Sequence, residues 1–234
     1  IEQWPFSAHH LYMTAGTYLS GIDYPGRIIL LGYDRAGQPV ALYAITGRSE
    51  NSRNRVLRSQ DGIIRTEPFD EFKVSDPSLI IYSAVRRIGE RIIVTNGDHT
   101  DTIYDEIISG GDVEGALVKR TYEPDGPIYT PRIAGIIDDA GYCLGIIRKD
   151  GENAERLLYR YGKEPGIAHV IHTYEGDSES VEPFASMPLR VELDGDVLED
   201  VWSSLSKGYR VASCCIAGND VRIINALEDG NGEA

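Results

Sequence analysis

The chain has 234 residues, a formal net charge of −14 and a hydrophobic fraction of 41%. This length suits one large domain spanning residues 1–234, because no change of composition and no Ser/Pro-rich linker divides the chain. The acidic charge argues against nucleic acid or an anionic membrane as a partner, since both bind cationic surfaces. No apolar run reaches the roughly 18 residues of a membrane span, so we expect a cytoplasmic protein without a membrane partner.

Two pairs of apolar runs, each joined by an Asp-x-Ala-Gly turn, predict β-hairpins. They lie at residues 28–33 with 40–45 and at residues 133–137 with 142–147. Related hairpins in two separate sheets would produce this repetition. Five further runs predict strands, at residues 79–85, 157–161, 169–174, 209–216 and 221–226. Strands therefore dominate the chain.

Apolar residues at helical spacing predict only two or three helices. These segments lie at residues 101–109, 112–119 and 197–205. Continuous apolar runs such as the one at residues 28–31 indicate strands that are covered on both faces. The sequence therefore predicts a layered α/β (α+β) sandwich, in which two antiparallel sheets pack on each other and carry the helices on their outer faces.

A polar loop at residues 95–101 follows a short β-branched run and contains Asn96-Gly97, which favours a sharp turn. Thr100 or Asp101 is then expected to cap a helix. The start of a helix presents unpaired N–H groups and a partial positive charge, so a polar substrate could dock there. The simpler alternative is that Asp98 and Asp101 only cap the helix.

Four arginines lie within eleven residues of a chain that has 23 Lys and Arg in total. They are Arg48, Arg53, Arg55 and Arg58. The planar fork of a guanidinium suits phosphate and carboxylate, so this cluster is interpreted as a phosphate clamp. An exposed loop that neutralises an acidic body is the alternative.

Two further groups of titratable residues have structural alternatives. Glu123 and Asp125 lie in a segment rich in Pro and Gly, which forms a surface turn unless a site uses its carboxylates. His169 and His172 are three residues apart on a predicted strand, so they should point to opposite faces. We therefore expect no metal site from this pair.

Five short blocks, taken together, resemble the archaeal-type inosine monophosphate (IMP) cyclohydrolases. The blocks are Tyr24-Pro-Gly-Arg27, Gly47-Arg-Ser-x-x-x-Arg53, Asn96-Gly-Asp-His-Thr-Asp101, Thr130-Pro-Arg-Ile-Ala134 and His172-Thr-Tyr-Glu175. Their order and spacing agree with that family over residues 24–177, whereas the first 23 residues and the last third of the chain match it poorly.

This resemblance implies a four-layered αββα sandwich similar to the N-terminal nucleophile hydrolases. It also implies the last step of purine biosynthesis, in which 5-formamidoimidazole-4-carboxamide ribonucleotide closes its pyrimidine ring and loses water to give IMP. The reaction requires no cofactor and no metal, and the partner is a small purine ribonucleotide. We also expect the chain to form a homo-oligomer.

The resemblance assigns roles to residues. Glu123 would accept an N–H proton of the carboxamide, while Arg53 and Tyr82 would face the formyl oxygen, which gains negative charge during attack. Arg55 fits the arginine position as well as Arg53 does, so both alternatives stay open. Further arginines are expected at the phosphate or ribose, and polar residues at the base or sugar. They are Arg27, Arg48 and Arg132, and Asn96, His99, Thr100 and Asp101.

Two other functions fit parts of the sequence. A metal-dependent phosphoester hydrolase would use Asp98, His99, Asp101 and Asp105, because Asp101 and Asp105 would share one helix face. A nucleotide-binding protein of the same fold without turnover is the other alternative. Activity that resists a chelator would distinguish a cyclohydrolase from the metal-dependent hydrolase. Formation of IMP would distinguish it from the nucleotide-binding protein.

Overall fold

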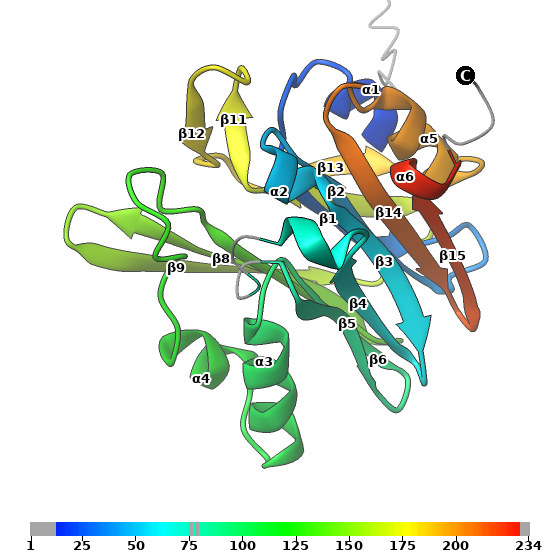
Figure 1. Cartoon of the computed structure of the whole chain (residues 1–234). Coiled ribbons are helices and arrows are strands. Elements are labelled where there is room, and N and C mark those ends of the chain that lie inside the picture. Colours follow the sequence, from blue (N-terminus) through cyan, green and yellow to red (C-terminus); the bar gives the residue numbers. More distant parts are fainter. Residues whose placement is uncertain (1–12, 75–76, 78–79, 230–234) are drawn as a thin grey trace, which may run out of the picture.

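Two large antiparallel β-sheets pack on each other, and helices lie on their outer faces (Figure 1). The computed structural model describes residues 13–74, 77 and 80–229. Strands far exceed helices in extent, as the sequence predicts.

The first sheet has six strands in the order β13-β10-β1-β2-β14-β15, and every neighbouring pair is antiparallel. Its strands are β1 (Arg27–Tyr33), β2 (Pro39–Thr46), β10 (Ile167–His172), β13 (Leu189–Glu192), β14 (Arg210–Ala217) and β15 (Asp220–Asn225). The hairpin predicted at residues 28–33 and 40–45 is confirmed as β1 and β2, which form the centre of this sheet.

The second sheet has seven strands that follow one another in sequence order. They are β3 (Arg55–Gln60), β4 (Ile63–Pro68), β5 (Tyr82–Ile88), β6 (Arg91–Thr95), β7 (Arg132–Ile137), β8 (Gly141–Asp150) and β9 (Asn153–Gly162). The second predicted hairpin is confirmed as β7 and β8, so the two related hairpins lie in different sheets. A small separate sheet pairs β11 (Tyr174–Gly176) with β12 (Val181–Pro183).

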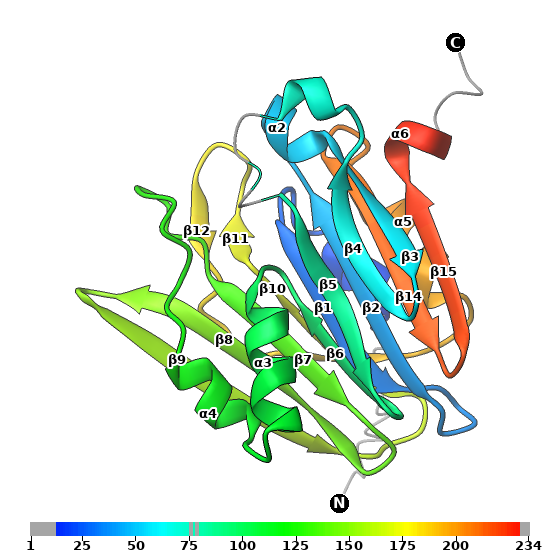
Figure 2. The same ribbon diagram turned by 60° about the horizontal axis from the view of Figure 1, so that its bottom comes forward.

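The helices are short. They are α1 (Ala15–Leu19), α2 (Glu50–Arg53), α3 (His99–Ile108), α4 (Val113–Val118), α5 (Val197–Ser204), α6 (Ala226–Asp229) and the 3-10 helix η1 (Glu71–Lys73). Helices α1 and α5 pack on the outer face of the six-stranded sheet, while α3 and α4 pack on that of the seven-stranded sheet (Figure 2). Among the residues that the structure describes, no helix has the length and apolarity needed to cross a membrane.

The alternating side chains of β1 explain why the sheet is apolar on both faces. Ile29 and Leu31 belong to the core between the two sheets, whereas Ile28 and Leu30 belong to the core beneath α1 and α5. Successive side chains of a strand point to opposite faces, so a continuous apolar run fills both cores. The prediction of two packed antiparallel sheets with few helices is confirmed.

Several boundaries differ from the sequence-based prediction. The apolar pattern does not predict β3 and β4, because charged and polar residues interrupt both strands. The strand predicted at residues 79–85 begins at Tyr82, and residue 79 lies outside the described residues. Helix α3 begins at His99, two residues before the predicted start, and no side chain caps it.

The packing between the sheets generates a stability prediction at Gly135 on β7. A Cβ atom at this position would lie 2.7 Å from Cδ1 of Leu31 on the facing sheet. We expect Gly135→Ala to lower the free energy of unfolding by about 1–3 kcal/mol through overpacking, and Leu31→Ala by about 2–5 kcal/mol through a cavity. The double variant should lose less than the sum of the two, because the alanine at 135 then fills part of the cavity. Urea unfolding of the four proteins measures this coupling, and strict additivity would contradict the packing described.

Candidate functional site

One open cavity of about 590 Å³ gathers charged side chains of both signs. Three cations line it, Arg27, Arg48 and Arg55, and two carboxylates line it with them, Glu123 and Asp125. The arginines of such a cavity can bind an anionic group, and a carboxylate can accept a proton.

Each of the five sequence blocks contributes at least one residue to the wall of this cavity. Besides the charged residues, the wall includes Tyr24, Ser49, Asn96, Thr130 and Tyr174, one from each block. These blocks are far apart in the sequence, and the fold brings them together. Several of these wall residues are neutral and were not expected as site residues, although the blocks already contained them.

Arg27, the first residue of β1, interacts electrostatically with four tyrosines, and its guanidinium lies 5.9 Å from the ring centre of Tyr174. Burial opposes its charge, but the hydroxyls of Tyr174, Tyr82, Tyr43 and Tyr24 raise the pKa of Arg27 above its ordinary value. The Nε of Arg27 is buried and has no hydrogen-bond partner among the described residues. Buried donors without a partner are rare in proteins, so this one marks Arg27 as a candidate functional residue.

Tyr82 does not line the cavity, although it lies close to Arg27. Its hydroxyl is 2.7 Å from the hydroxyl of Tyr43, and both phenols are buried. Tyr82 therefore acts on Arg27 electrostatically but is not part of the cavity wall.

Arg55, and not Arg53, reaches the wall of the cavity. Arg55 is buried as the first residue of β3, and its Nε donates to the carbonyl of Ser52 over 2.7 Å. Arg53 is exposed at the end of α2 and lines a different cavity with Phe69 and Lys73. The geometry thus separates the two arginines that the sequence leaves as alternatives.

Arg48 lies at the rim beside the short helix α2. It is exposed, and its guanidinium stacks over the ring of Tyr24 at 4.9 Å. Ser49 caps α2, since its hydroxyl accepts from the N–H of Ser52, 3.1 Å away. The turn that carries Arg48 is therefore ordered by its own serines.

Glu123 is a buried carboxylate on the loop that precedes β7. Its Oε1 lies 2.9 Å from Nη1 of Arg132. Burial raises the pKa of Glu123, whereas Arg132 and Arg27 lower it, and the net pKa is above its ordinary value. A raised pKa suits a carboxylate that takes up a proton during a reaction near neutral pH.

The loop around Glu123 is held by its own polar groups. The N–H of Glu123 donates to the carbonyl of Thr130 over 2.9 Å, and the N–H of Thr130 donates to Asp125 over 2.7 Å. The Thr130 hydroxyl contacts both Asp125 and the hydroxyl of Tyr174. The side chain of Asp125 is therefore bound within the loop, whereas the side chain of Glu123 is paired with Arg132 of β7.

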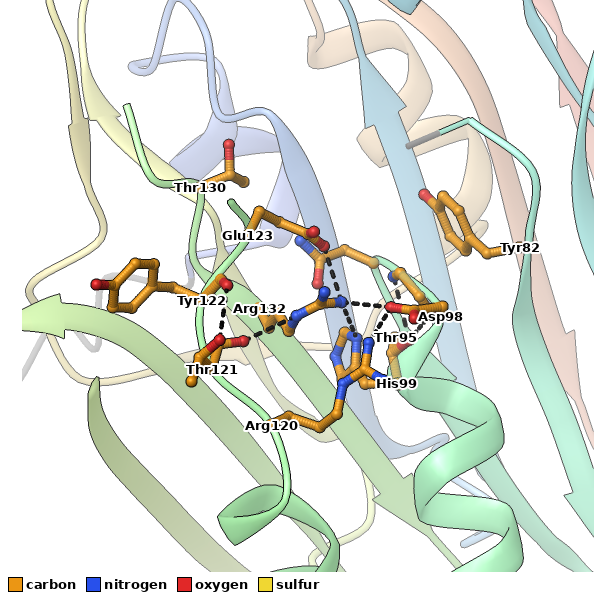
Figure 3. Close-up of polar contacts among 12 residues, drawn as sticks. Tyr82, Thr95, Asp98, His99, Arg120, Thr121, Tyr122, Glu123, Thr130 and Arg132 are labelled. Atoms are coloured by element: carbon orange, nitrogen blue, oxygen red, sulfur yellow. Dashed lines mark hydrogen bonds and ion pairs between the residues drawn. The ribbon is translucent and has the colours of Figure 1, made fainter. Parts of the chain in front are cut away.

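Four of the expected substrate-binding residues do not line the cavity: His99, Thr100, Asp101 and Arg132. Arg132 and His99 are buried behind Glu123 and contact each other (Figure 3). The Thr100 hydroxyl donates to the carbonyl of Gly97 over 3.0 Å. Asp101 is exposed on α3 and pairs with Arg86 at 2.7 Å. Asn96 does line the cavity, but its amide also ties the loop to β7 through Pro131 and Ile133.

The same contacts bear on the alternative metal site. Asp98 accepts from Arg120 and Arg132, and Asp101 accepts from Arg86, so arginines occupy both carboxylates. Within the described part of the chain, no group of three or more His, Cys, Asp or Glu side chains is arranged to hold a metal ion. Two of the four residues proposed for that site, Asp98 and Asp101, therefore form ion pairs with arginines.

Similarity to known proteins covers the part of the chain that forms this cavity. Residues 24–221 match a family model described as "IMP cyclohydrolase-like protein". The IMP cyclohydrolase of Haloquadratum walsbyi is 30% identical over 198 residues, which cover 83% of this chain and 89% of that protein. Those of Methanopyrus kandleri and Methanothrix thermoacetophila are each 32% identical, over 60% and 65% of this chain and 76% and 74% of those proteins. The range matched by the family model contains every residue of the cavity wall.

Two buried histidines generate a prediction for the pH dependence of stability. Burial lowers the pKa of His99 from 6.5 to about 3 and that of His172 to about 4. The unfolded chain binds these protons already near pH 6.5, so stability is lost as the pH falls below that value. We expect the free energy of unfolding to decrease from pH 7 to pH 5.5, by at most about 1.4 kcal/mol per pH unit for each histidine. Urea titrations measure the slope, and His172→Gln should flatten it; an unchanged slope in that variant would refute the assignment.

Proposed function

The chain belongs to the family of IMP cyclohydrolase-like proteins, and from this premise we propose that it closes 5-formamidoimidazole-4-carboxamide ribonucleotide to IMP. It is then a cyclohydrolase of purine biosynthesis. The observation that carries the proposal is a single cavity in which a buried carboxylate with a raised pKa and three arginines form parts of the same wall.

The reaction makes specific demands on a protein. The carboxamide nitrogen attacks the formyl carbon, a C–N bond forms, and the formyl oxygen becomes negatively charged. The carboxamide and the formamido nitrogen each lose one proton, and both protons leave with that oxygen as water. Because nucleophile and electrophile belong to one molecule, the cavity has to orient the two reacting groups and does not have to bring two reactants together.

Glu123 fits the role of the base that takes the carboxamide proton. It is the carboxylate of the cavity that no group within its own loop occupies, and its pKa is raised. The nearby charge of Arg132 keeps the carboxylate form accessible, because an opposite charge favours ionisation. A base whose pKa lies closer to the operating pH transfers protons more efficiently.

Arg27 fits the developing oxyanion, while Arg48 and Arg55 fit the phosphate. Arg27 acts electrostatically on Glu123, so its guanidinium lies close to the base, and its Nε is unpaired. Arg48 and Arg55 flank the serine-capped turn of α2 at the same cavity. Tyr82 and its hydrogen-bonded partner Tyr43 both act electrostatically on Arg27. The sequence-based expectation places Arg27 at the phosphate or ribose, whereas this proposal places it at the formyl oxygen. Arg55 takes the place of Arg53 in the site.

The proposal extends to the fold and the setting of the enzyme. The two sheets and their outer helices support the four-layered αββα sandwich of the N-terminal nucleophile hydrolases, acting as one domain. A purine ribonucleotide is the substrate, and no cofactor takes part. The cytoplasmic location and the homo-oligomer stay predictions from the sequence.

Incubation with the formamido ribonucleotide tests the function directly. We expect IMP to form, measured by absorbance and identified by chromatography, with the deformylated ribonucleotide as a control that binds without reacting. Binding of the substrate without formation of IMP would favour the nucleotide-binding alternative. Loss of activity in the presence of a chelator would favour the metal-dependent one.

Removal of the base gives the first prediction on activity. Glu123→Gln keeps the size of the side chain but removes the proton acceptor, so we expect kcat to fall roughly 10²–10⁴-fold. The KM should change much less, because the arginines still hold the phosphate. Thermal unfolding of the variant controls for loss of the ion pair with Arg132. A folded Glu123→Gln variant with full kcat would exclude this residue as the base.

The two neighbouring arginines provide a matched pair of variants. Arg55→Gln should raise KM roughly 10–100-fold, because it removes charge-assisted hydrogen bonds to the phosphate. Arg53→Gln changes an exposed residue outside the cavity, so KM and kcat should stay within about twofold of wild type. Steady-state kinetics of the two variants decide between them, and the reverse pattern would restore Arg53 to the site.

A further inference from the structure

The Nη1 atom of Arg132 is the centre of a buried contact network behind Glu123. It lies 2.9 Å from Oε1 of Glu123, 2.7 Å from Oδ1 of Asp98 and 3.2 Å from Nδ1 of His99. Figure 3 shows Arg132 between Glu123 on one side and Asp98 and His99 on the other. The position of Glu123 therefore depends on what fixes Arg132.

The partners of His99 define its protonation state. Arg132 can only donate, so Nδ1 of His99 accepts from it, and Nε2 must then carry the proton that it donates to the carbonyl of Ile133, 3.0 Å away. The imidazole is therefore neutral. Ile133 follows Arg132 on β7, so His99 forms hydrogen bonds with both the side chain of Arg132 and the adjacent backbone carbonyl.

We propose that His99 is a positioning residue for Glu123 and acts through Arg132, holding the guanidinium at the distance where it pairs with the carboxylate. This inference rests on the proposed role of Glu123 as the base. His99 does not line the cavity and touches no substrate. His99 contributes a neutral hydrogen-bond acceptor for Arg132, at a position where a charged side chain would disturb the ion pair between Arg132 and Glu123.

The charges around Glu123 explain why the acceptor has to be neutral. Arg132 on β7 and Arg27 on β1 favour its ionised form, while Asp98 before α3 and Asp125 in its own loop disfavour it. A carboxylate in place of His99 would compete with Glu123 for Arg132. A protonated imidazole would repel Arg132 and would no longer accept its hydrogen bond.

The network also fixes the base of the loop that carries Glu123. Nε of Arg132 donates to the carbonyl of Thr121 over 2.9 Å, and Asp98 binds the guanidinium of Arg120. Arg120, Thr121 and Glu123 of this loop are thus all bound by Asp98 or Arg132. Displacement of Arg132 would move the carboxylate relative to the cavity.

Two conservative substitutions of His99 separate a positioning role from a merely structural one. His99→Asn places its amide oxygen near the position of Nδ1, so it keeps the acceptor for Arg132 and loses the donor to Ile133. His99→Gln places its amide nitrogen near the position of Nε2, so it keeps the donor and loses the acceptor. The two variants each lose one hydrogen bond of the same imidazole.

In His99→Asn, we expect the apparent pKa of the acidic limb of the kcat/KM–pH profile to stay within about 0.3 pH units of the wild-type value. In His99→Gln it should move up by roughly one unit, because Arg132 is held less closely to Glu123. We also expect kcat at pH 7 to fall several-fold more in His99→Gln than in His99→Asn. If His99→Gln behaves like wild type while His99→Asn is impaired, or if the two are equally affected, the positioning role is refuted.

A second readout makes the inference independent of turnover. A carbon-13 NMR titration of the Glu123 carboxyl, assigned with Glu123→Gln, should give a higher pKa in His99→Gln than in wild type and His99→Asn. If wild type forms no IMP but this shift occurs, the proposed function fails and the positioning role of His99 stands. If IMP forms and neither the NMR titration nor the pH profile distinguishes the two variants, only the positioning role fails.

Discussion

The buried ion pair between Arg132 and Glu123 determines the geometry of the site. Two charges removed from water are stable only when further hydrogen bonds satisfy them, and Asp98, His99 and the carbonyl of Thr121 do this for Arg132. Removal of Arg132 would deprive the buried carboxylate of Glu123 of its ion-pair partner, whereas removal of Glu123 would still leave Arg132 paired with Asp98. The loop that carries Glu123 therefore takes its position from a strand of the sheet, which is more rigid than a loop alone.

The cations of the cavity come from the ends of strands. Arg27 and Arg55 are the first residues of β1 and β3, and Arg48 lies two residues after β2. This placement matters because the chain has a net charge of −14 and would repel a phosphorylated ligand at long range. Attraction has to come from guanidinium groups at short range, in a cavity where screening by water is reduced.

The sequence predicts the central strands and the two related hairpins, because continuous β-branched runs are the signal of strands covered on both faces. It does not predict β3 and β4, whose arginines and polar residues hide the strand pattern. Glu123 lies in none of the five blocks; the resemblance to the family assigns it the role of the base, and the structure places it on the cavity wall. The roles of His99 and Arg132 are not readable from sequence, since a polar residue in a site block can bind the ligand or hold the residue that does.

The choice between Arg53 and Arg55 shows why spacing alone could not define the site. Helix α2 ends at Arg53 and β3 begins at Arg55, so the chain passes from helix to strand at Asn54, which has φ −79° and ψ 53°. Side chains two residues apart across such a change point in different directions, whereas the sequence shows only two equivalent arginines. Because Arg55 belongs to the sheet and its Nε is held by Ser52, its guanidinium is fixed before a ligand binds. A cation fixed in this way loses less conformational entropy on binding than an exposed arginine would, which favours a strand residue over a helix residue at this wall.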